Sequence, residues 1–501
     1  MKKTWLLILM LVLTLGLVAC GGNDDPDDPD DPDDPNPTDT ATIHLSYADW
    51  GDAEFNQRMI DLFEEAHPNV QVELRTDIVG AGAEFTGNLA LAAQAGILPD
   101  VFVTDNVPTV VNSGLTLDTA QYWDADEDTD LVYEGISQTA VYNGKRYALP
   151  SFQFLKGILI NLDIFEEANL STVEGSYRID NDGYPVKDWT FDEFVNIAKA
   201  IKNFTGDPAD TVIGLDTWYG TPDFQQVWPM MNDEDVMYDT WDGESFHYTS
   251  EDWIYAMQEK VALQQLTDGT LSGNYPEAIE TARADENYDG RYDFLYTYLI
   301  QTGYVAMDIE GSWQFWVIND AAENDINLGF WPYPSGSEGL FPPTILDYIC
   351  VSSQTEYPEM AYELAKWMSF GKDGWDARLT LLEADREEAL ANDEIPSYLD
   401  RFPVANYDGV WERVSALVDG IEGIDYTFDR IEYAKPDLDK WLPGYKDFWA
   451  WVNDSENNQY SWLNLLEAGP TAVATYAAEW EAKANQIVQD QIATLGSDTE
   501  E

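Results

Sequence analysis

Cysteine and histidine are scarce in this chain of 501 residues, which contains two Cys and three His. So few of them leave no disulfide framework and no spacing typical of a zinc site. His44, His67 and His247 form no HExxH motif and no close pair. Gly80 and Gly82 lack the third glycine of a dinucleotide-binding loop, and neither a phosphate-loop lysine motif nor a G-x-S-x-G turn occurs. The sequence therefore predicts no cofactor and points to no catalytic centre.

Basic side chains are also few. Lys and Arg number 25 against 94 Asp and Glu, which gives a formal net charge of −69 at pH 7. Nucleic acid and an anionic membrane surface would both be repelled, so neither is expected to be a direct ligand. The acidity indicates solubility in a salty or extracellular setting, and a cationic ligand is the less favoured alternative. Carboxylates are too abundant for their number to indicate a glycosidase pair.

A hydrophobic run long enough to span a bilayer is missing as well. Residues 5–18 are continuously apolar but number only 14, against the roughly 20 needed for one crossing. With Lys2 and Lys3 before it, this run predicts a signal peptide over 1–19. The residues LVAC at 17–20 resemble a bacterial lipobox, which implies cleavage before Cys20 and lipidation of Cys20. An uncleaved anchor is the alternative.

The segment 20–41 has the composition of a spacer. Asp-Asp-Pro occurs four times in succession between Asp24 and Pro35. Proline and mutual repulsion of the aspartates favour an extended coil. The chain is therefore predicted to lie on the extracytoplasmic face of the cell membrane, touching the membrane only through its lipid anchor.

From residue 42 onward, strand and helix patterns alternate, which predicts βαβ units and a parallel sheet. Ligands of such sheets gather beyond the carboxyl ends of the strands, where Asp49, Trp50 and Asp105 fall. Thr190 and Glu193 form a capping box at a helix start. The expected strands are 42–47, 69–74, 101–103, a strand ending near 152, 156–163, 211–218, 327–332 and 344–352; the expected helices are 53–67, 84–95, 189–204 and one beginning at 358.

The stretch YVAMDIEGSWQFW at 304–316 predicts an apolar strand, a turn at Gly311, and a helix that begins at Trp313. Glu310 and Trp313 would then lie beside each other, where a carboxylate and an exposed aromatic face can act together on a ligand. Cys350 sits in an apolar run and is expected to be a small buried residue.

Six short segments occur in a characteristic order: FEEAHP at 63–68, AAQAG at 92–96 with PDV at 99–101, GKRYALP at 144–150, NLDIF at 161–165, WTFDEF at 189–194 and GSW at 311–313. Together they resemble the extracellular solute-binding proteins of carbohydrate ABC transporters, which are related to maltose-binding protein. The resemblance covers 42–370 and fades from Gly371 onward. Residues 380–414 look like an insertion.

The resemblance implies an α/β, two-lobe periplasmic-binding-protein-like fold with hinge strands and a largely helical C-terminal part. Lobe 1 would comprise 42–152 plus 333–370, and lobe 2 would comprise 153–332 plus 371–501. A ligand bound between the lobes would close the hinge, and an ABC permease would recognise the closed form. Such a protein is expected to be a monomer and not an enzyme.

A sugar presents apolar faces that aromatic rings cover and hydroxyls that carboxylates and amides bind. By the resemblance, Trp313 corresponds to the family's stacking tryptophan. The other candidate ligand-binding residues are Trp218, Tyr219, Trp50, Asp105, Gln153, Glu310, Trp331 and Asp347. Most remaining tryptophans are expected in the core.

The sequence thus predicts extracytoplasmic binding of a carbohydrate and its delivery to an ABC importer. The many aromatics favour an oligosaccharide, while peptide and polyol ligands stay open. A secreted carbohydrate-active enzyme (a hydrolase or a lyase) and a surface adhesin are the alternatives.

One segment partly fits a calcium loop. Asp285, Asn287, Asp289 and Asp293 occupy ligand positions, but Tyr296 stands where a bidentate Glu is required. An acidic surface turn is therefore the favoured interpretation, and no metal site is predicted.

Overall fold

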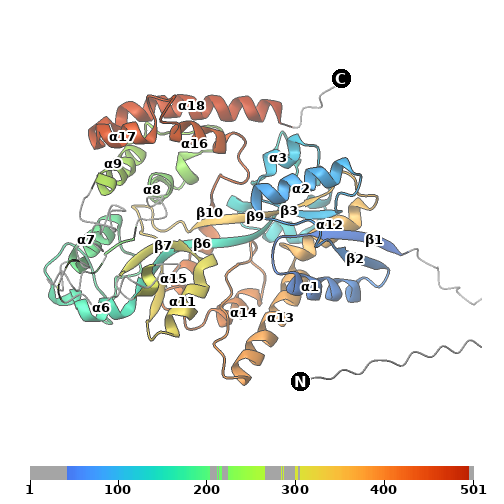
Figure 1. Cartoon of the computed structure of the whole chain (residues 1–501), viewed down its shortest axis with the longest axis horizontal. Helices are drawn as coiled ribbons and strands as arrows, with labels where there is room; N and C mark the ends of the chain where they lie inside the picture. Colours follow the sequence, from blue (N-terminus) through green and yellow to red (C-terminus); the bar gives the residue numbers. More distant parts are fainter. Residues whose placement is uncertain are drawn as a thin grey trace, which may run out of the picture. The chain divides into compact units, whose positions relative to one another are not determined.

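The alternating pattern at the start of the body folds into parallel strands with intervening helices (Figure 1). β1 pairs in parallel with β2 on one side and with β3 on the other. Asp52 caps the first helix by accepting hydrogen bonds from the next backbone N–H groups. The predicted elements are confirmed as β1 (Ile43–Ala48), α1 (Ala53–Ala66), β2 (Val70–Leu74), α2 (Gly82–Gln94) and β3 (Val101–Thr104).

This computed structural model describes residues 42–202, 212, 214–216, 224–265, 284, 286, 299–302 and 305–495. The described residues belong to one compact unit that begins at Thr42. The following predictions lie outside the described residues: the signal peptide, Cys20 and the acidic spacer, the binding residues Trp218 and Tyr219, and the calcium candidates Asp285, Asn287, Asp289 and Asp293.

A single long strand, β6 (Leu149–Asn161), connects the two halves of the sheet. The sequence predicted two strands here, and this was wrong because residues 153–155 continue the ladder. The first half of β6 pairs antiparallel with β9 (Pro343–Val351), and the second half pairs with β7 (Met307–Gly311) and β8 (Leu328–Trp331). The strand order is β2-β1-β3-β9-β6-β7. The two-lobe periplasmic-binding-protein-like fold is thereby confirmed, with β6 and β9 as its crossing strands.

Short elements follow β3 in the first lobe and helices cover the second. Thr190 and Glu193 form the predicted capping box, with backbone-to-side-chain distances of 2.8 and 3.3 Å. The elements are α3 (Val107–Asn112), α4 (Ala120–Trp123), α5 (Glu134–Ser137), β4 (Val141–Tyr142), β5 (Lys145–Arg146), α6 (Leu162–Ala168), α7 (Phe191–Lys202), α8 (Phe224–Asn232), α9 (Glu251–Gln265) and α11 (Phe315–Ala322).

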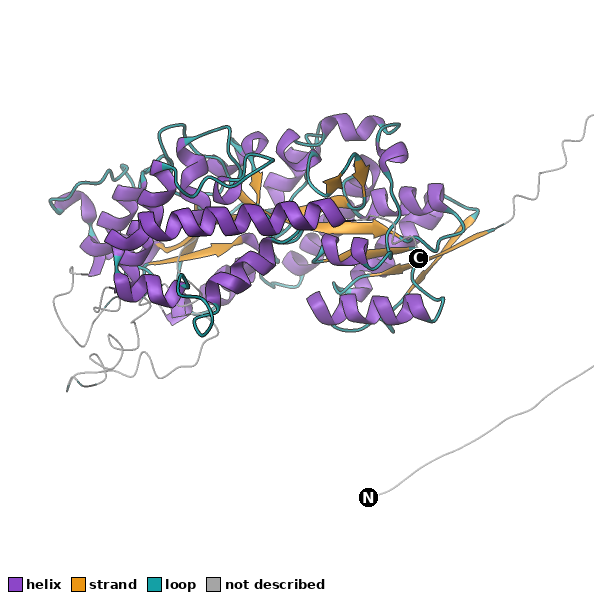
Figure 2. Ribbon diagram, turned by 90° about the horizontal axis from the view of Figure 1, so that it is seen from above, coloured by secondary structure: helices purple, strands orange, loops and turns teal. Residues whose placement is uncertain are grey.

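The C-terminal part is largely helical, as predicted. In Figures 1 and 2, α18 runs along one side of the unit, from the α9 end toward α3. α13 packs against α1 and α12, and Arg58 of α1 pairs with Asp385 of α13 at 2.8 Å. The elements are α12 (Pro358–Met368), α13 (Lys372–Ala391), α14 (Val410–Leu417), α15 (Asp425–Phe428), β10 (Lys435–Pro436), α16 (Tyr445–Asn453), α17 (Trp462–Ala468) and α18 (Val473–Thr494). The residue limits of the two lobes stay a prediction.

The core is rich in large aromatic side chains. Among the fully buried ones are Trp189, Trp253, Trp375 and Trp480, as the sequence led us to expect for most tryptophans. Cys350 is completely buried, which confirms that prediction, and burial raises the pKa of its thiol to about 12. Among the helices of the described ranges, none is both long and apolar enough to cross a bilayer.

Candidate functional site

The carboxyl ends of β1 and β3 bring polar and aromatic residues to the start of α2. Asp49 accepts hydrogen bonds from the Tyr47 hydroxyl and the Gly51 backbone, so its carboxylate is held in place. Trp50 lies with its ring 5.1 Å from that of Phe85, in an edge-on arrangement. Asp105 accepts a hydrogen bond of 3.3 Å from the hydroxyl of Thr86, the residue after Phe85. Trp50 and Asp105 therefore both contact α2, as parallel strands with a common edge require.

The turn at 311–313 matches its prediction: β7 ends at Gly311 and a short 3-10 turn, η6 (Ser312–Gln314), leads into α11. A Cβ atom on Gly311 would lie only 2.1 Å from the Trp313 ring, so the ring packs directly on the glycine. The Ser312 hydroxyl accepts from Leu155 N on β6 at 3.1 Å. The partly buried Trp313 ring contacts Phe154 edge-on at 6.0 Å. Glycine is thus required for this position of the tryptophan.

Glu310 is buried, with 8% of its surface exposed. Burial raises the pKa of its carboxyl to about 7, although hydrogen bonds from the Gly311 backbone and the Trp313 side chain oppose the rise. Asp308, two residues earlier on the same face of β7, is buried too. Burial, Asp216 and Glu310 raise the pKa of Asp308 well above its usual value. Glu310 is therefore a buried carboxyl whose side-chain partner is Trp313.

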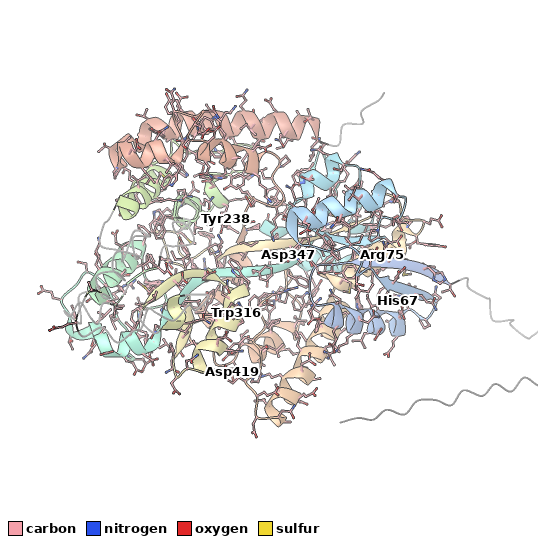
Figure 3. The ribbon with its side chains drawn as sticks, viewed as in Figure 1. His67, Arg75, Tyr238, Trp316, Asp347 and Asp419 are labelled. Atoms are coloured by element: carbon pink, nitrogen blue, oxygen red, sulfur yellow. The ribbon has the colours of Figure 1, made fainter. Side chains whose placement is uncertain are left out.

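The crossing strands place Asp347 and Gln153 differently. Asp347 on β9, labelled in Figure 3, lies near the middle of the sheet. Its carboxylate forms an ion pair of 2.6 Å with Lys440. Burial is the largest influence and acts to lower the pKa of Lys440, but the charge and hydrogen bond of Asp347, together with the charges of Asp437 and Asp105, outweigh it and the pKa is raised. The charge of Asp105 acts on Lys440 in the same direction, so Lys440 lies within the electrostatic reach of both carboxylates and pairs with Asp347. Gln153, on β6, is fully buried, and its side-chain amide donates to the Pro403 carbonyl at 2.6 Å. Its side chain therefore ties β6 to residue 403.

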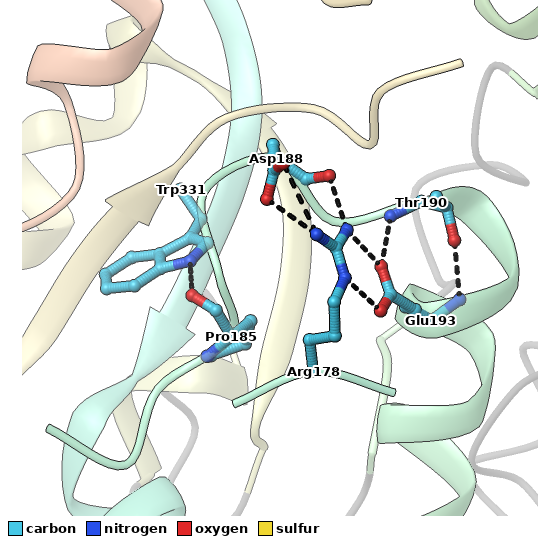
Figure 4. A network of polar contacts seen from close by, with 6 residues as sticks. All are labelled: Arg178, Pro185, Asp188, Thr190, Glu193 and Trp331. Carbon is cyan, nitrogen blue, oxygen red and sulfur yellow. Dashed lines mark hydrogen bonds and ion pairs between the residues drawn. The ribbon is translucent and has the colours of Figure 1, made fainter. Parts of the chain in front are cut away.

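Trp331 is not brought to a common surface with Trp313. It is fully buried on β8, and its indole N–H donates to the Pro185 carbonyl at 2.9 Å (Figure 4). The amine of Lys187 lies 2.9 Å from the ring centroid. The same region is held by Arg178, which contacts Glu193 at 2.7 Å. With its faces covered and its N–H bound, Trp331 has a packing position in this conformation.

Reasoning from the sequence missed Arg401, which lies in the 380–414 region that looked like an insertion. Its guanidinium lies 5.7 Å from the centroid of the Phe154 ring. Its Nη1 atom is 3.8 Å from the position a Gly51 Cβ would occupy, beside Asp49. One signal was available: RFPV at 401–404 has an alternating strand-like pattern, but its partner strand is remote in sequence.

We use the term cleft cluster for the residues linked by these contacts, from the ends of β1 and β3, through β6 and β9, to the turn after β7. An aromatic wall, fixed carboxylates and a guanidinium stand together in it, an arrangement able to bind a ligand with apolar faces and hydroxyl groups. Of the predicted residues it contains Trp313, Glu310, Trp50, Asp105 and Asp347; the additional members are Asp49, Phe154, Arg401 and Lys440.

A polar cavity of about 370 Å³ borders the cluster near Asp105. It lies between α3, residues 439–447 and the end of α18, and Lys446 lines it while donating to the Asp105 carbonyl at 3.4 Å. Of the predicted aromatic residues that the structure describes, none lines this cavity. Within the described ranges, no three His, Cys, Asp or Glu side chains come together in a way that would hold a metal ion.

The model of a family described as bacterial extracellular solute-binding protein matches residues 58–380. No curated protein matches the sequence.

Solved structures of similar fold include an ABC substrate-binding protein from Listeria monocytogenes in complex with cycloalternan, which is 16% identical with a TM-score of 0.54 and covers 91% of this chain and 99% of its own. The cyclic α-maltosyl-1,6-maltose binding protein from Arthrobacter globiformis is 16% identical with a TM-score of 0.56, covering 90% and 100%. The sugar-binding protein MalE from Xanthomonas citri is 16% identical with a TM-score of 0.56, covering 90% and 98%.

Proposed function

The chain belongs to the bacterial extracellular solute-binding proteins, and we propose that it binds a carbohydrate between its two lobes and delivers it to an ABC importer. The ligand class is supported by the cleft cluster and by two proteins of similar fold, one in complex with cycloalternan and one that binds cyclic α-maltosyl-1,6-maltose. An oligosaccharide fits best, because the cluster offers more than one aromatic ring.

The observation that carries the proposal is the supported position of Trp313. Its ring rests on Gly311, meets Phe154 edge-on and bonds Glu310. A large ring that is partly exposed yet held from three sides is suited to stacking on a sugar face. The side chain is already fixed before the ligand arrives, so binding costs little further conformational entropy.

The remaining parts of the proposal concern the protein's setting. We propose that Cys20 carries a lipid anchor, that the protein is a monomer without enzymatic turnover, and that ligand binding closes the lobes about β6 and β9. Closure would follow from contacts that a ligand makes to both lobes at once.

The test measures binding of neutral oligosaccharides by isothermal titration calorimetry and by thermal shift. We expect the wild-type protein to bind at least one member of a panel of malto-, cello- and xylo-oligosaccharides and to be stabilised by it. Trp313→Ala is expected to lose about 2 kcal/mol of binding free energy, roughly a thirtyfold loss of affinity, because a stacked face of order 80 Å² goes uncovered at about 25 cal/mol per Å².

Trp462→Ala is the matched control. This partly buried tryptophan of α17 contacts Lys260 instead of the cluster, so its removal should leave the affinity unchanged. If Trp313→Ala binds sugar as tightly as the wild type, the assignment of Trp313 to the binding site is wrong. Release of shortened sugars by the wild-type protein would contradict a purely binding role.

A further inference from the structure

Residues 400–406, here called the bracing segment, complete the ladder of the crossing strand β6. Phe402 and Gln153 exchange two backbone hydrogen bonds, of 3.0 and 2.9 Å. The Gln153 side-chain amide adds a bond of 2.6 Å to the Pro403 carbonyl. The β6 register shifts between Pro150 and Gln153, so the bracing segment pairs with β6 where its ladder with β9 is irregular.

The bracing segment is attached to both lobes. In the first lobe, the backbone of Tyr133 donates to Val404 at 3.0 Å, and Asn406 donates to Leu131 at 2.9 Å. In the second lobe, the hydroxyl of Ser312 donates to the carbonyl of residue 400. Ser312 directly precedes Trp313, so the backbone on which Arg401 stands is fixed relative to the aromatic wall.

The side chain of Arg401 lies at the junction of the cluster's aromatic and acidic parts. It lies over the rings of Phe154 and Phe152, 5.7 and 5.9 Å from their centroids. Its Nε pairs with Asp400 at a long 3.6 Å, and 37% of the side chain is exposed. Within the described part of the chain, its two terminal NH₂ groups make no hydrogen bond. Those groups are donors held in place without acceptors.

The charges around Arg401 balance. Arg378 is buried behind it, with its guanidinium 4.5 Å from the centroid of Phe152. Burial, followed by the charge of Arg401, lowers the pKa of Arg378 to about 10. The carboxylates of Asp49 and Asp400 lie in the same group and offset the two positive charges. A hydroxyl group both donates and accepts hydrogen bonds, so it suits a guanidinium flanked by carboxylates better than a lone anion does.

We propose that Arg401 is a ligand-binding residue supplied by the bracing segment, and that its two NH₂ groups donate to hydroxyl oxygens of a neutral sugar lying against Phe154 and Trp313. This rests on the proposed function and assigns a role to the 380–414 region. Because the bracing segment is attached to both lobes, this contact would also reach the ligand from the junction between them.

The experiment compares Arg401→Lys and Arg401→Gln with the wild-type protein by calorimetry, using the neutral oligosaccharide that the wild type binds most tightly in the panel named above. Lys keeps the charge and much of the aliphatic stem over the rings but lacks the planar fork. We expect both variants to lose affinity about tenfold or more, while their thermal midpoints without ligand stay near that of the wild type. Arg58→Gln, which removes a partly buried arginine on α1 that pairs with Asp385 away from the cleft cluster, is the matched control and should bind like the wild type.

Wild-type affinity in either Arg401 variant would overturn the assignment. A trigalacturonate that binds more tightly than every neutral sugar, with affinity falling steeply as salt is added, would overturn the neutral ligand class. Failure of the wild-type protein to bind any sugar would instead contradict the proposed function itself. If Arg401→Gln is destabilised, the Lys variant and its ligand-induced rise in thermal midpoint decide the outcome.

Discussion

Gly311→Ala adds one methyl group at the point where Trp313 rests on the backbone. The backbone at Gly311 is extended, with φ of −124°, a conformation that alanine adopts without strain. The obstacle is the Trp313 ring, whose nearest atoms would lie 2.1, 2.3 and 2.4 Å from the new Cβ. An ordinary contact needs about 3.4 Å or more, so the ring has to move by roughly 1.3 Å.

The expected loss of stability follows from the contacts that the Trp313 ring gives up when it moves. The edge-on contact with Phe154 is worth about 0.5–1.5 kcal/mol. The hydrogen bond to the buried Glu310 is lost at about 1–3 kcal/mol. We therefore expect the free energy of unfolding to fall by about 2–4 kcal/mol, and the affinity for sugar to fall although the mutated residue presents no side chain to a ligand.

The assay is chemical denaturation of a double-mutant cycle with Trp313→Ala. Without the ring, the added methyl group meets open space, so Gly311→Ala should change stability by less than about 0.5 kcal/mol in that background. Gly87→Ala is the control. This glycine of α2 has no neighbour within 4 Å of the position that a Cβ would occupy, so alanine should raise the free energy of unfolding of the protein by about 0.5–1 kcal/mol. Equal losses for Gly311→Ala in both backgrounds would refute the reasoning.

Two further predictions concern charge and anchoring. Because the pKa of Glu310 is raised from 4.5 to about 7, the folded state binds more protons than the unfolded state between these values, and its contribution to stability is lost as pH rises through that window. Glu310→Gln should therefore gain up to about 3 kcal/mol relative to the wild type between pH 5 and pH 8, measured by urea denaturation at both; a constant difference would contradict it. Cys20→Ser is expected to move the protein from the membrane fraction to the medium in a fractionation experiment, while a Cys350→Ser variant stays anchored; retention of Cys20→Ser in the membrane would contradict lipidation.

Local elements were predictable because their causes are local. The buried face of α12 follows from the spacing of Ala361, Leu364, Ala365 and Met368. The capping box at Thr190 needs two residues three positions apart. The glycine turn that precedes Trp313 is equally local, since the ring packs on Gly311 two positions before it.

The burial of the candidate site residues and the partners of their side chains were not predictable from local patterns. The pattern around Glu310 suggested a carboxylate available to a ligand, but strand pairing buries it and its partner is Trp313. Trp331 looked like a binding residue because it ends a strand near the return crossing. The 185–187 loop, remote in sequence, covers it.

The sequence by itself determined the alternation of strands and helices, the order of the family's segments and the aromatic turn at Trp313. These depend on neighbours within a few residues of one another. The tertiary structure decided which polar groups face a ligand. Gln153 meets Pro403 across 250 positions, and that pairing brings Arg401 beside Phe154 and Asp49. No local pattern specifies such a contact, because it depends on how the complete sheet brings β6 beside a segment that is remote in sequence.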